Sequence, residues 1–145
     1  MKRHLFILFL LIVICVTKGF SQSQVTEITW TGIGPKTYYG LLVLYPNNQG
    51  SFIVKFYDHY LGWITCHQDA VLTNRFDVFG NCTSVINCYY PKTTPNVPYV
   101  ADNFIIYPNG AMYTQDAMGA WSTLITATAI HPIHWQTKFL EYGLK

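Results

Sequence analysis

Hydrophobic and polar positions alternate with a period of two along much of this chain, which is the pattern of strands with one buried face. In residues 51–58, Phe52, Val54 and Phe56 share one face, while the residues between them, Lys55 among them, form the other. Valine, isoleucine, threonine and aromatic residues dominate these segments. The pattern predicts strands at residues 40–45, 51–58, 60–68, 75–79, 103–107, 111–116 and 121–130.

Two strong turn signals divide these strands into hairpins. Residues 46–50 read Pro-Asn-Asn-Gln-Gly, and residues 108–110 read Pro-Asn-Gly, which favours a tight hairpin turn. Strands that follow one another in local hairpins indicate an antiparallel meander. We therefore predict a small all-β fold, closed as a barrel or folded as a sandwich, with one helical turn around residues 138–142.

The first 21 residues carry the features of a secretory signal peptide. A basic start precedes an apolar run over residues 5–16, and Gly19 and Ser21 place small residues before a cleavage site. Twelve apolar residues span about 18 Å as a helix, too short for a hydrocarbon core of about 30 Å. The sequence therefore predicts a signal peptide at 1–21 and a single all-β domain at 22–145. We expect a secreted or periplasmic protein with no membrane span after cleavage.

The segment from residue 82 to residue 103 differs from the strands around it. It holds three prolines and the tyrosines Tyr89, Tyr90 and Tyr99, which predicts one long loop. In an oxidising compartment, Cys82 and Cys88 are the favoured disulfide at its entry, and pairings through Cys66 are the competitors.

Charge and motifs exclude several functional classes. Without the leader, six basic and seven acidic residues remain, so the net charge is near −1 and nucleic acid is not an expected partner. No phosphate loop, dinucleotide fingerprint or zinc-ligand spacing is present, and we predict no cofactor and no metal. Cys66 and His67, neighbours in a predicted strand, would point to opposite faces and could not form a catalytic dyad.

The unusual feature of the composition is its aromatic content, with 11 tyrosines and 4 tryptophans. Tyrosine and tryptophan combine an apolar face with a hydrogen-bonding group, and both are enriched at recognition surfaces. We therefore predict a non-catalytic binding module for an unknown protein or carbohydrate ligand. The expected contact residues are Tyr38, Trp63, Tyr89, Tyr90 and Tyr99.

Two alternatives remain open at this stage. A small exported hydrolase would use Asp69 and Asp116, which share a Gln-Asp-Ala context, or His131 and His134. A surface-assembly subunit would instead pair exposed strand edges between copies. The first requires a pocket that gathers these polar groups, and the second requires a long unpaired edge strand.

Overall fold

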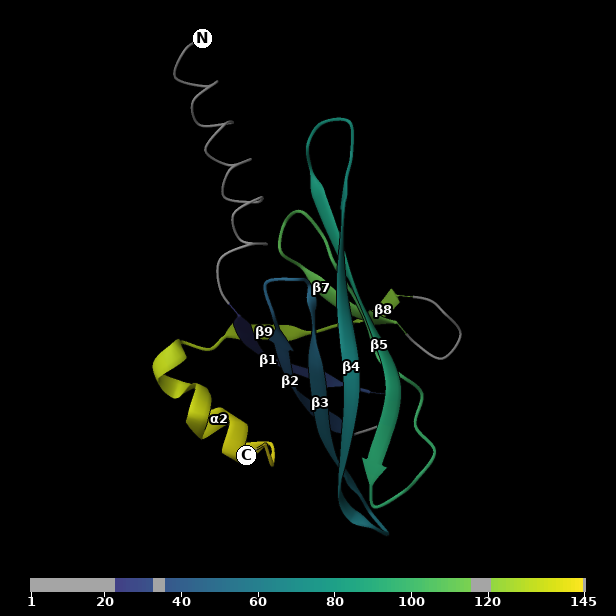
Figure 1. Cartoon of the computed structure of the whole chain (residues 1–145). Coiled ribbons are helices and arrows are strands. Elements are labelled where there is room, and N and C mark those ends of the chain that lie inside the picture. Colours follow the sequence, from purple (N-terminus) through teal and green to yellow (C-terminus); the bar gives the residue numbers. More distant parts are fainter. Residues whose placement is uncertain (1–22, 33–35, 116–120, 145) are drawn as a thin grey trace.

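Antiparallel strands and one short C-terminal helix make up the fold (Figure 1). The computed structural model describes residues 23–32, 36–115 and 121–144. The strands are β1 (Gln24–Thr31), β2 (Thr37–Leu44), β3 (Gln49–Asp58), β4 (Gly62–Phe76), β5 (Cys82–Thr94), β6 (Asn103–Ile106), β7 (Met112–Gln115), β8 (Trp121–Leu124) and β9 (Thr126–Ala129). A 3₁₀ turn, η1 (Pro132–His134), leads into the helix α2 (Trp135–Glu141). The predicted all-β class is confirmed, and the predicted helical turn is the end of a longer helix.

The C-terminal strands bring the two ends of the meander together. The strand order is β8-β7-β6-β5-β4-β3-β2-β1-β9, and all pairs are antiparallel. Only Ile125 separates β8 from β9 along the chain, and its N–H donates to the carbonyl of Met112 at 3.0 Å. The continuous segment formed by β8 and β9 pairs with β7 through β8 and with β1 through β9. The sheet therefore becomes a nearly closed barrel. Of the two closures left open by the sequence, the barrel-like one is observed.

The barrel interior is filled by the inward side chains of the strands. Phe52, Val54 and Phe56 of β3 are buried there, as their alternation predicts. The Phe52 ring meets Phe104 edge to face, with centroids 5.1 Å apart. A Cβ atom at Gly40 would lie 2.5 Å from the Phe52 ring, so the glycine leaves the space that the ring fills.

Part of the outer surface of the barrel is also buried, because α2 covers it. Leu41, Val43 and Ile53 point outward and pack with Tyr142, and Phe139 of α2 contacts the same cluster. In Figure 1 the helix lies beside β1, β2 and β3. The C-terminal half of β2 is therefore buried on both faces, which explains its continuous apolar sequence.

Most of the predicted long loop is a strand. β5 pairs with β4 along its length, and a single bulge places Tyr90 and Pro91 opposite Gln68. Tyr90 has a positive φ of 54°. A bulge accommodates proline because its extra residue needs no ladder hydrogen bond. The loop prediction is wrong for residues 82–94, and only residues 95–102 connect β5 to β6 without a strand.

The predicted disulfide is also wrong. Cys82 and Cys88 lie on the same strand, β5, six residues apart. Six residues of strand span about 20 Å, whereas disulfide-bonded Cα atoms lie within about 7 Å of each other. All three described cysteines are free thiols, with Cys66 and Cys88 buried and Cys82 half-buried.

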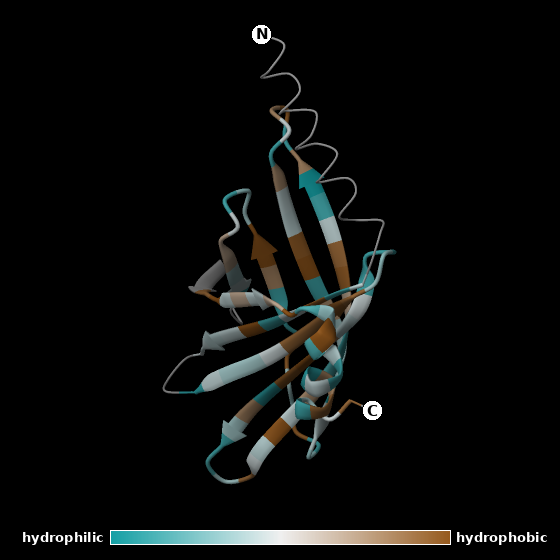
Figure 2. Ribbon diagram, turned by 90° about the vertical axis from the view of Figure 1, so that its left-hand side faces the viewer, coloured by the Kyte–Doolittle hydropathy of each residue, from teal (hydrophilic) through white to brown (hydrophobic). Residues whose placement is uncertain are grey.

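The hairpin of β4 and β5 projects beyond the rest of the sheet, as the side view of Figure 2 shows. β3 pairs with β4 only as far as Val71, and β6 pairs with β5 only from Ser84. At the tip, the Asp77 carboxylate accepts the N–H of Phe79 at 2.9 Å. The Asn81 side-chain amide donates to the same carboxylate at 2.9 Å, and this bond, together with the backbone bonds, lowers the pKa of Asp77. The turn leaves Val78 and Phe79 exposed.

Candidate functional site

Two of the five predicted contact residues face the barrel interior. Tyr38 stacks on Trp30 with ring centroids 5.2 Å apart and planes 7° apart. Tyr99 stacks on Phe56 at 5.6 Å, and its hydroxyl donates to the carboxylate of Asp102 at 3.1 Å. Burial raises the pKa of both phenols. Tyr38 and Tyr99 therefore contribute to the barrel interior and not to an exposed contact surface.

The other three predicted residues lie on the outer face, in two separate places. Tyr89 and Tyr90 are neighbours on β5, with centroids 6.3 Å apart, and Tyr90 is 81% exposed. Tyr89 pairs with Asp69, which is six residues along β4 from Trp63, or about 20 Å. The five residues do not form one surface.

Trp63 instead belongs to a group of aromatic side chains that the sequence prediction did not identify. Tyr57 of β3 lies directly opposite Trp63 of β4, and their ring centroids are 5.8 Å apart. Tyr39 of β2 is 6.3 Å from Trp63. The exposed fractions are 39% for Tyr39, 54% for Tyr57 and 58% for Trp63. We call these three residues the outer aromatic cluster.

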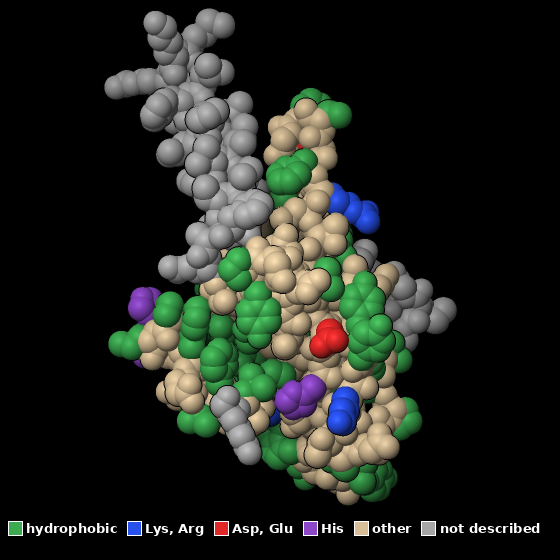
Figure 3. Space-filling view, viewed as in Figure 1, with side chains coloured by type: hydrophobic (Ala, Val, Ile, Leu, Met, Phe, Trp, Pro, Cys, Tyr) green, Lys and Arg blue, Asp and Glu red, His purple; other side chains and the backbone are tan. Residues whose placement is uncertain are grey.

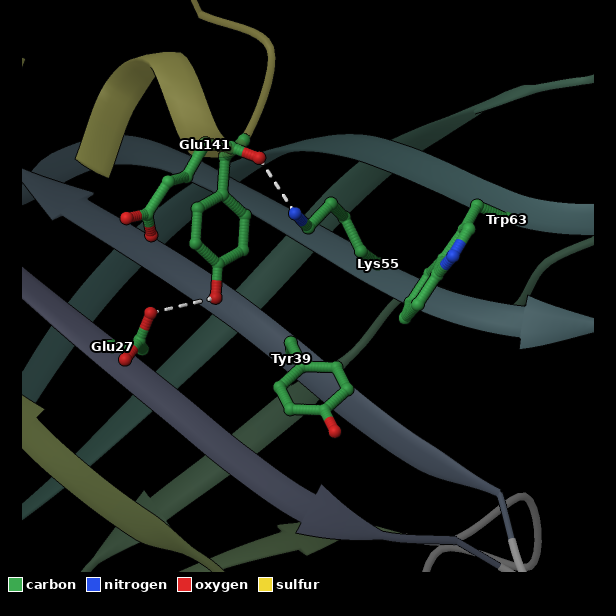
Figure 4. A pocket seen from close by; sticks show the side chains of 6 residues that line it. Glu27, Tyr39, Lys55, Trp63 and Glu141 are labelled. Atoms are coloured by element: carbon green, nitrogen blue, oxygen red, sulfur yellow. Dashed lines mark hydrogen bonds between the residues drawn. The ribbon is translucent and has the colours of Figure 1, made fainter. Parts of the chain in front are cut away.

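A hollow of about 230 Å³ adjoins the outer aromatic cluster, where the C-terminal end of α2 meets the sheet (Figure 4). In this view Tyr39 and Trp63 stand along one part of the hollow, and Lys55 extends between Trp63 and the helix end. Four adjacent strands and the helix end supply its lining. The residues are Glu27, Tyr39, Lys55, Trp63, Glu141 and Tyr142.

Each charged side chain around the hollow has a polar or charged partner. Lys138 of α2 lies 3.0 Å from a carboxylate oxygen of both Glu27 and Glu141, and these two acceptors raise the pKa of Lys138. The Lys55 ammonium donates to the Glu141 carbonyl at 2.7 Å and lies 4.6 Å from the centre of the Tyr142 ring. The Tyr142 hydroxyl donates to Glu27 at 3.1 Å. Two carboxylates and two ammonium groups therefore balance around one hollow.

A second polar group lies inside the barrel. The side-chain amide of Gln68 donates to Asp102 at 2.6 Å, and its oxygen accepts the Asp102 N–H at 2.9 Å. Burial raises the pKa of Asp102 to about 6, although the bonds from Gln68 and Tyr99 oppose the shift. Burial also raises the pKa of the Cys66 thiol to about 12. Cys66 is therefore protonated at neutral pH and is no nucleophile.

The residues proposed for a hydrolase do not form a described pocket. Asp69 lies exposed on β4, and Asp116 lies outside the described residues. His131 precedes η1 and His134 is its last residue, and the His131 ring accepts the Ile133 N–H at 3.3 Å. Over the described part of the chain, no three histidine, cysteine or acidic residues are grouped as metal ligands.

Charged side chains are few on the face of the molecule shown in Figure 3. On the face shown in Figure 3, over β3, β4 and β5, hydrophobic and uncharged polar atoms predominate, and the charged side chains stand apart. Within residues 23–32, 36–115 and 121–144, no helix combines the length and apolar character needed to cross a membrane.

Comparison with known proteins gives no further assignment. No family model, no curated protein sequence and no solved structure matches this chain. The candidate site therefore rests on geometry alone. That geometry favours the outer aromatic cluster and its hollow, which include Trp63 but none of the other four residues predicted from sequence.

Proposed function

We propose that the protein is an exported, non-catalytic binding module whose contact surface is the outer aromatic cluster with its adjoining hollow. One observation carries this proposal: three aromatic side chains from three successive strands converge on the outer face and stay exposed. The Tyr57–Trp63 pair adds some stability to the sheet as a cross-strand contact, but more than half of each side chain stays exposed. Large, stiff aromatic side chains of this kind make efficient contact residues.

Support for export comes from the position of the first strand. β1 begins at Gln24, so cleavage after Ser21 removes no residue of the sheet. The leader, with its short apolar run and small residues before the cleavage site, is of the type that signal peptidase removes. Secretion, or retention in a periplasm, therefore remains the proposed destination.

The two alternative functions have less support. A hydrolase needs an acid and a base that meet in one pocket, and Asp69, His131 and His134 stand on surface elements instead. A surface-assembly subunit needs a long free edge. Among the described strands, the projecting hairpin leaves one side of residues 73–76 of β4 and of residues 89–94 of β5 without a partner strand, but these edges are short and carry Arg75, Pro91 and Lys92, which hinder edge pairing.

The test is calorimetric titration of the exported protein with three ligand classes: oligosaccharides, peptides and choline. Binding to any class that is lost in Trp63→Ala and retained in Tyr107→Ala supports the proposal. Tyr107 is the matched control because it is 39% exposed, like Tyr39, and lies in the β6–β7 turn.

Mass spectrometry of the recovered ligand then separates binding from catalysis, since a binding module returns its ligand unchanged. A cleaved ligand contradicts the non-catalytic assignment. Binding that survives Trp63→Ala, or the absence of binding to all three classes, contradicts the proposed surface.

A further inference from the structure

We infer that the hollow beside the outer aromatic cluster accepts one ring of a neutral saccharide, stacked against Trp63. This inference rests on the proposed function, because it names the ligand class of the same surface. The hollow has a volume of about 230 Å³, which is below the range of about 300–1,000 Å³ for drug-sized ligands. The hollow is suited to a single six-membered sugar ring, with the rest of the saccharide outside it.

The charge balance of the hollow favours a neutral ligand. Glu27 and Glu141 are each 3.0 Å from Lys138, and Lys55 is held against the Glu141 carbonyl. The two carboxylates and two ammonium groups sum to zero charge, so the hollow has no excess charge to attract an ion. A cationic ligand would compete with Lys138 for Glu27 and Glu141, and an anionic ligand would meet these carboxylates beside Lys55. A neutral ligand leaves the ion pairs intact.

The hydrogen-bonding groups of the hollow favour hydroxyl groups as ligands. A carboxylate has about four lone-pair sites and accepts several donors, and an ammonium group has three N–H donors. Glu27 accepts from Lys138 and Tyr142 through one oxygen, and Lys55 donates one bond to Glu141. A sugar hydroxyl both donates and accepts, so adjacent hydroxyls can bond to a carboxylate and to an ammonium group. An apolar side chain of a peptide would desolvate these groups and return no hydrogen bond.

The aromatic side chains favour the apolar face of a sugar ring. Trp63 is 58% exposed and forms one side of the hollow, with Tyr39 next to it (Figure 4). The ring C–H groups of a pyranose can lie on such an aromatic face while its hydroxyls point toward polar partners. A quaternary ammonium ligand would also suit aromatic rings, but the Lys55 ammonium already lies over Tyr142 and would repel it.

An array of printed neutral and acidic oligosaccharides tests the ligand class, followed by calorimetric titration of the exported protein with the best neutral oligosaccharide. Three variants are compared with the unaltered protein. Trp63→Ala removes the stacking face, Lys55→Met removes the ammonium but retains the length that packs on Tyr142, and Tyr107→Ala is the control. Tyr107 borders a separate hollow with Asn109 and Tyr113.

We expect Trp63→Ala to weaken binding of the neutral oligosaccharide about tenfold or more, and Lys55→Met to weaken it severalfold. Tyr107→Ala should leave the dissociation constant unchanged. Circular dichroism melting checks that all three variants fold. If Trp63→Ala does not fold, Lys55→Met still tests the inference.

The outcomes separate this inference from the proposed function. Preference for acidic oligosaccharides, for a peptide or for choline, with loss in Trp63→Ala, overturns the neutral saccharide and leaves the surface as a binding site. Loss of binding in Tyr107→Ala alone moves the site to the β6–β7 turn and overturns both. No binding to any oligosaccharide on the array overturns the saccharide inference outright.

Discussion

The half-buried Asp102 directs its carboxyl group toward Gln68 and Tyr99 in the barrel interior, and its ionisation should make the protein less stable at neutral pH than in mild acid. Its folded-state pKa is raised from 3.8 to about 6. A carboxyl group with a raised folded-state pKa binds more protons in the folded than in the unfolded protein between these two values. The free energy of unfolding therefore falls as pH rises through this window. The shift of about 2 units corresponds to about 3 kcal/mol once both states are fully ionised.

The titratable groups around Asp102 do not change charge in this pH range, so the change in stability reports on Asp102 alone. Tyr38, Tyr99, Cys66 and Cys88 all have raised pKa values, so all four stay neutral from mild acid to neutral pH. Gln68 carries no charge. Between about pH 7.5 and about pH 4.5 the unaltered protein should therefore recover about 2 kcal/mol from Asp102, the remainder requiring still lower pH.

Asp102→Asn is the variant that isolates this effect. It retains the size of the side chain and one oxygen acceptor for Gln68 or Tyr99, but it cannot ionise. Urea unfolding at several pH values, followed by circular dichroism, gives the free energy of unfolding of both proteins. Other acidic residues, such as Asp58 with its lowered pKa, titrate equally in both and cancel in the difference. Parallel pH profiles, or a relative gain of the unaltered protein with rising pH, would refute the reasoning.

Three further predictions follow from the fold. Intact mass spectrometry of the exported protein should give a chain that begins near Gln22, and a mass that includes the leader would contradict cleavage. In the native protein a thiol reagent should label Cys82 but not Cys66 or Cys88, and all three should react after unfolding; a mass change of 2 Da on reduction would show a disulfide instead. Gly40→Ala should lower the free energy of unfolding by about 1–3 kcal/mol, because the added methyl group collides with Phe52 in the packed interior; an unchanged melting temperature would show that the ring can move.

The sequence predicts the hairpins well because their signals are local. The alternation in β3 identifies the inward face, and the turn before it identifies its partner β2. Even the pairing of Tyr57 with Trp63 is accessible in principle, since both flank one short turn in a hairpin. What the pattern does not resolve is the length of the β4–β5 hairpin. The strand predicted at 60–68 and the start of the strand predicted at 75–79 belong to one strand, β4, whose polar tip end has no buried face. The strand prediction is wrong for residues 77–79, which form the turn.

The prolines in residues 82–103 indicate a loop, and Pro91 shows why that prediction fails for β5. Pro91 lies in a bulge, where the ladder requires no N–H, so a strand tolerates a residue that usually ends one. Once β5 is a strand, Cys82 and Cys88 are held far apart along it and the predicted disulfide fails. The bulge at Pro91 therefore accounts for both errors, the predicted loop and the predicted cysteine pairing.

The direction of a loop side chain depends on partners that are distant in sequence, and Tyr99 illustrates this. Its surroundings of prolines and polar residues indicate exposure, yet its hydroxyl reaches Asp102, which in turn binds Gln68 across the barrel interior, 34 residues away. The hollow depends on longer separations still, because Glu27 meets Tyr142 across 115 residues. Period-two alternation shows that Tyr39, Lys55 and Trp63 point outward, but it does not show that α2 returns to lie against them. The helix turns three exposed strand positions into one wall of a hollow, and a site formed in that way becomes visible only when the chain is folded.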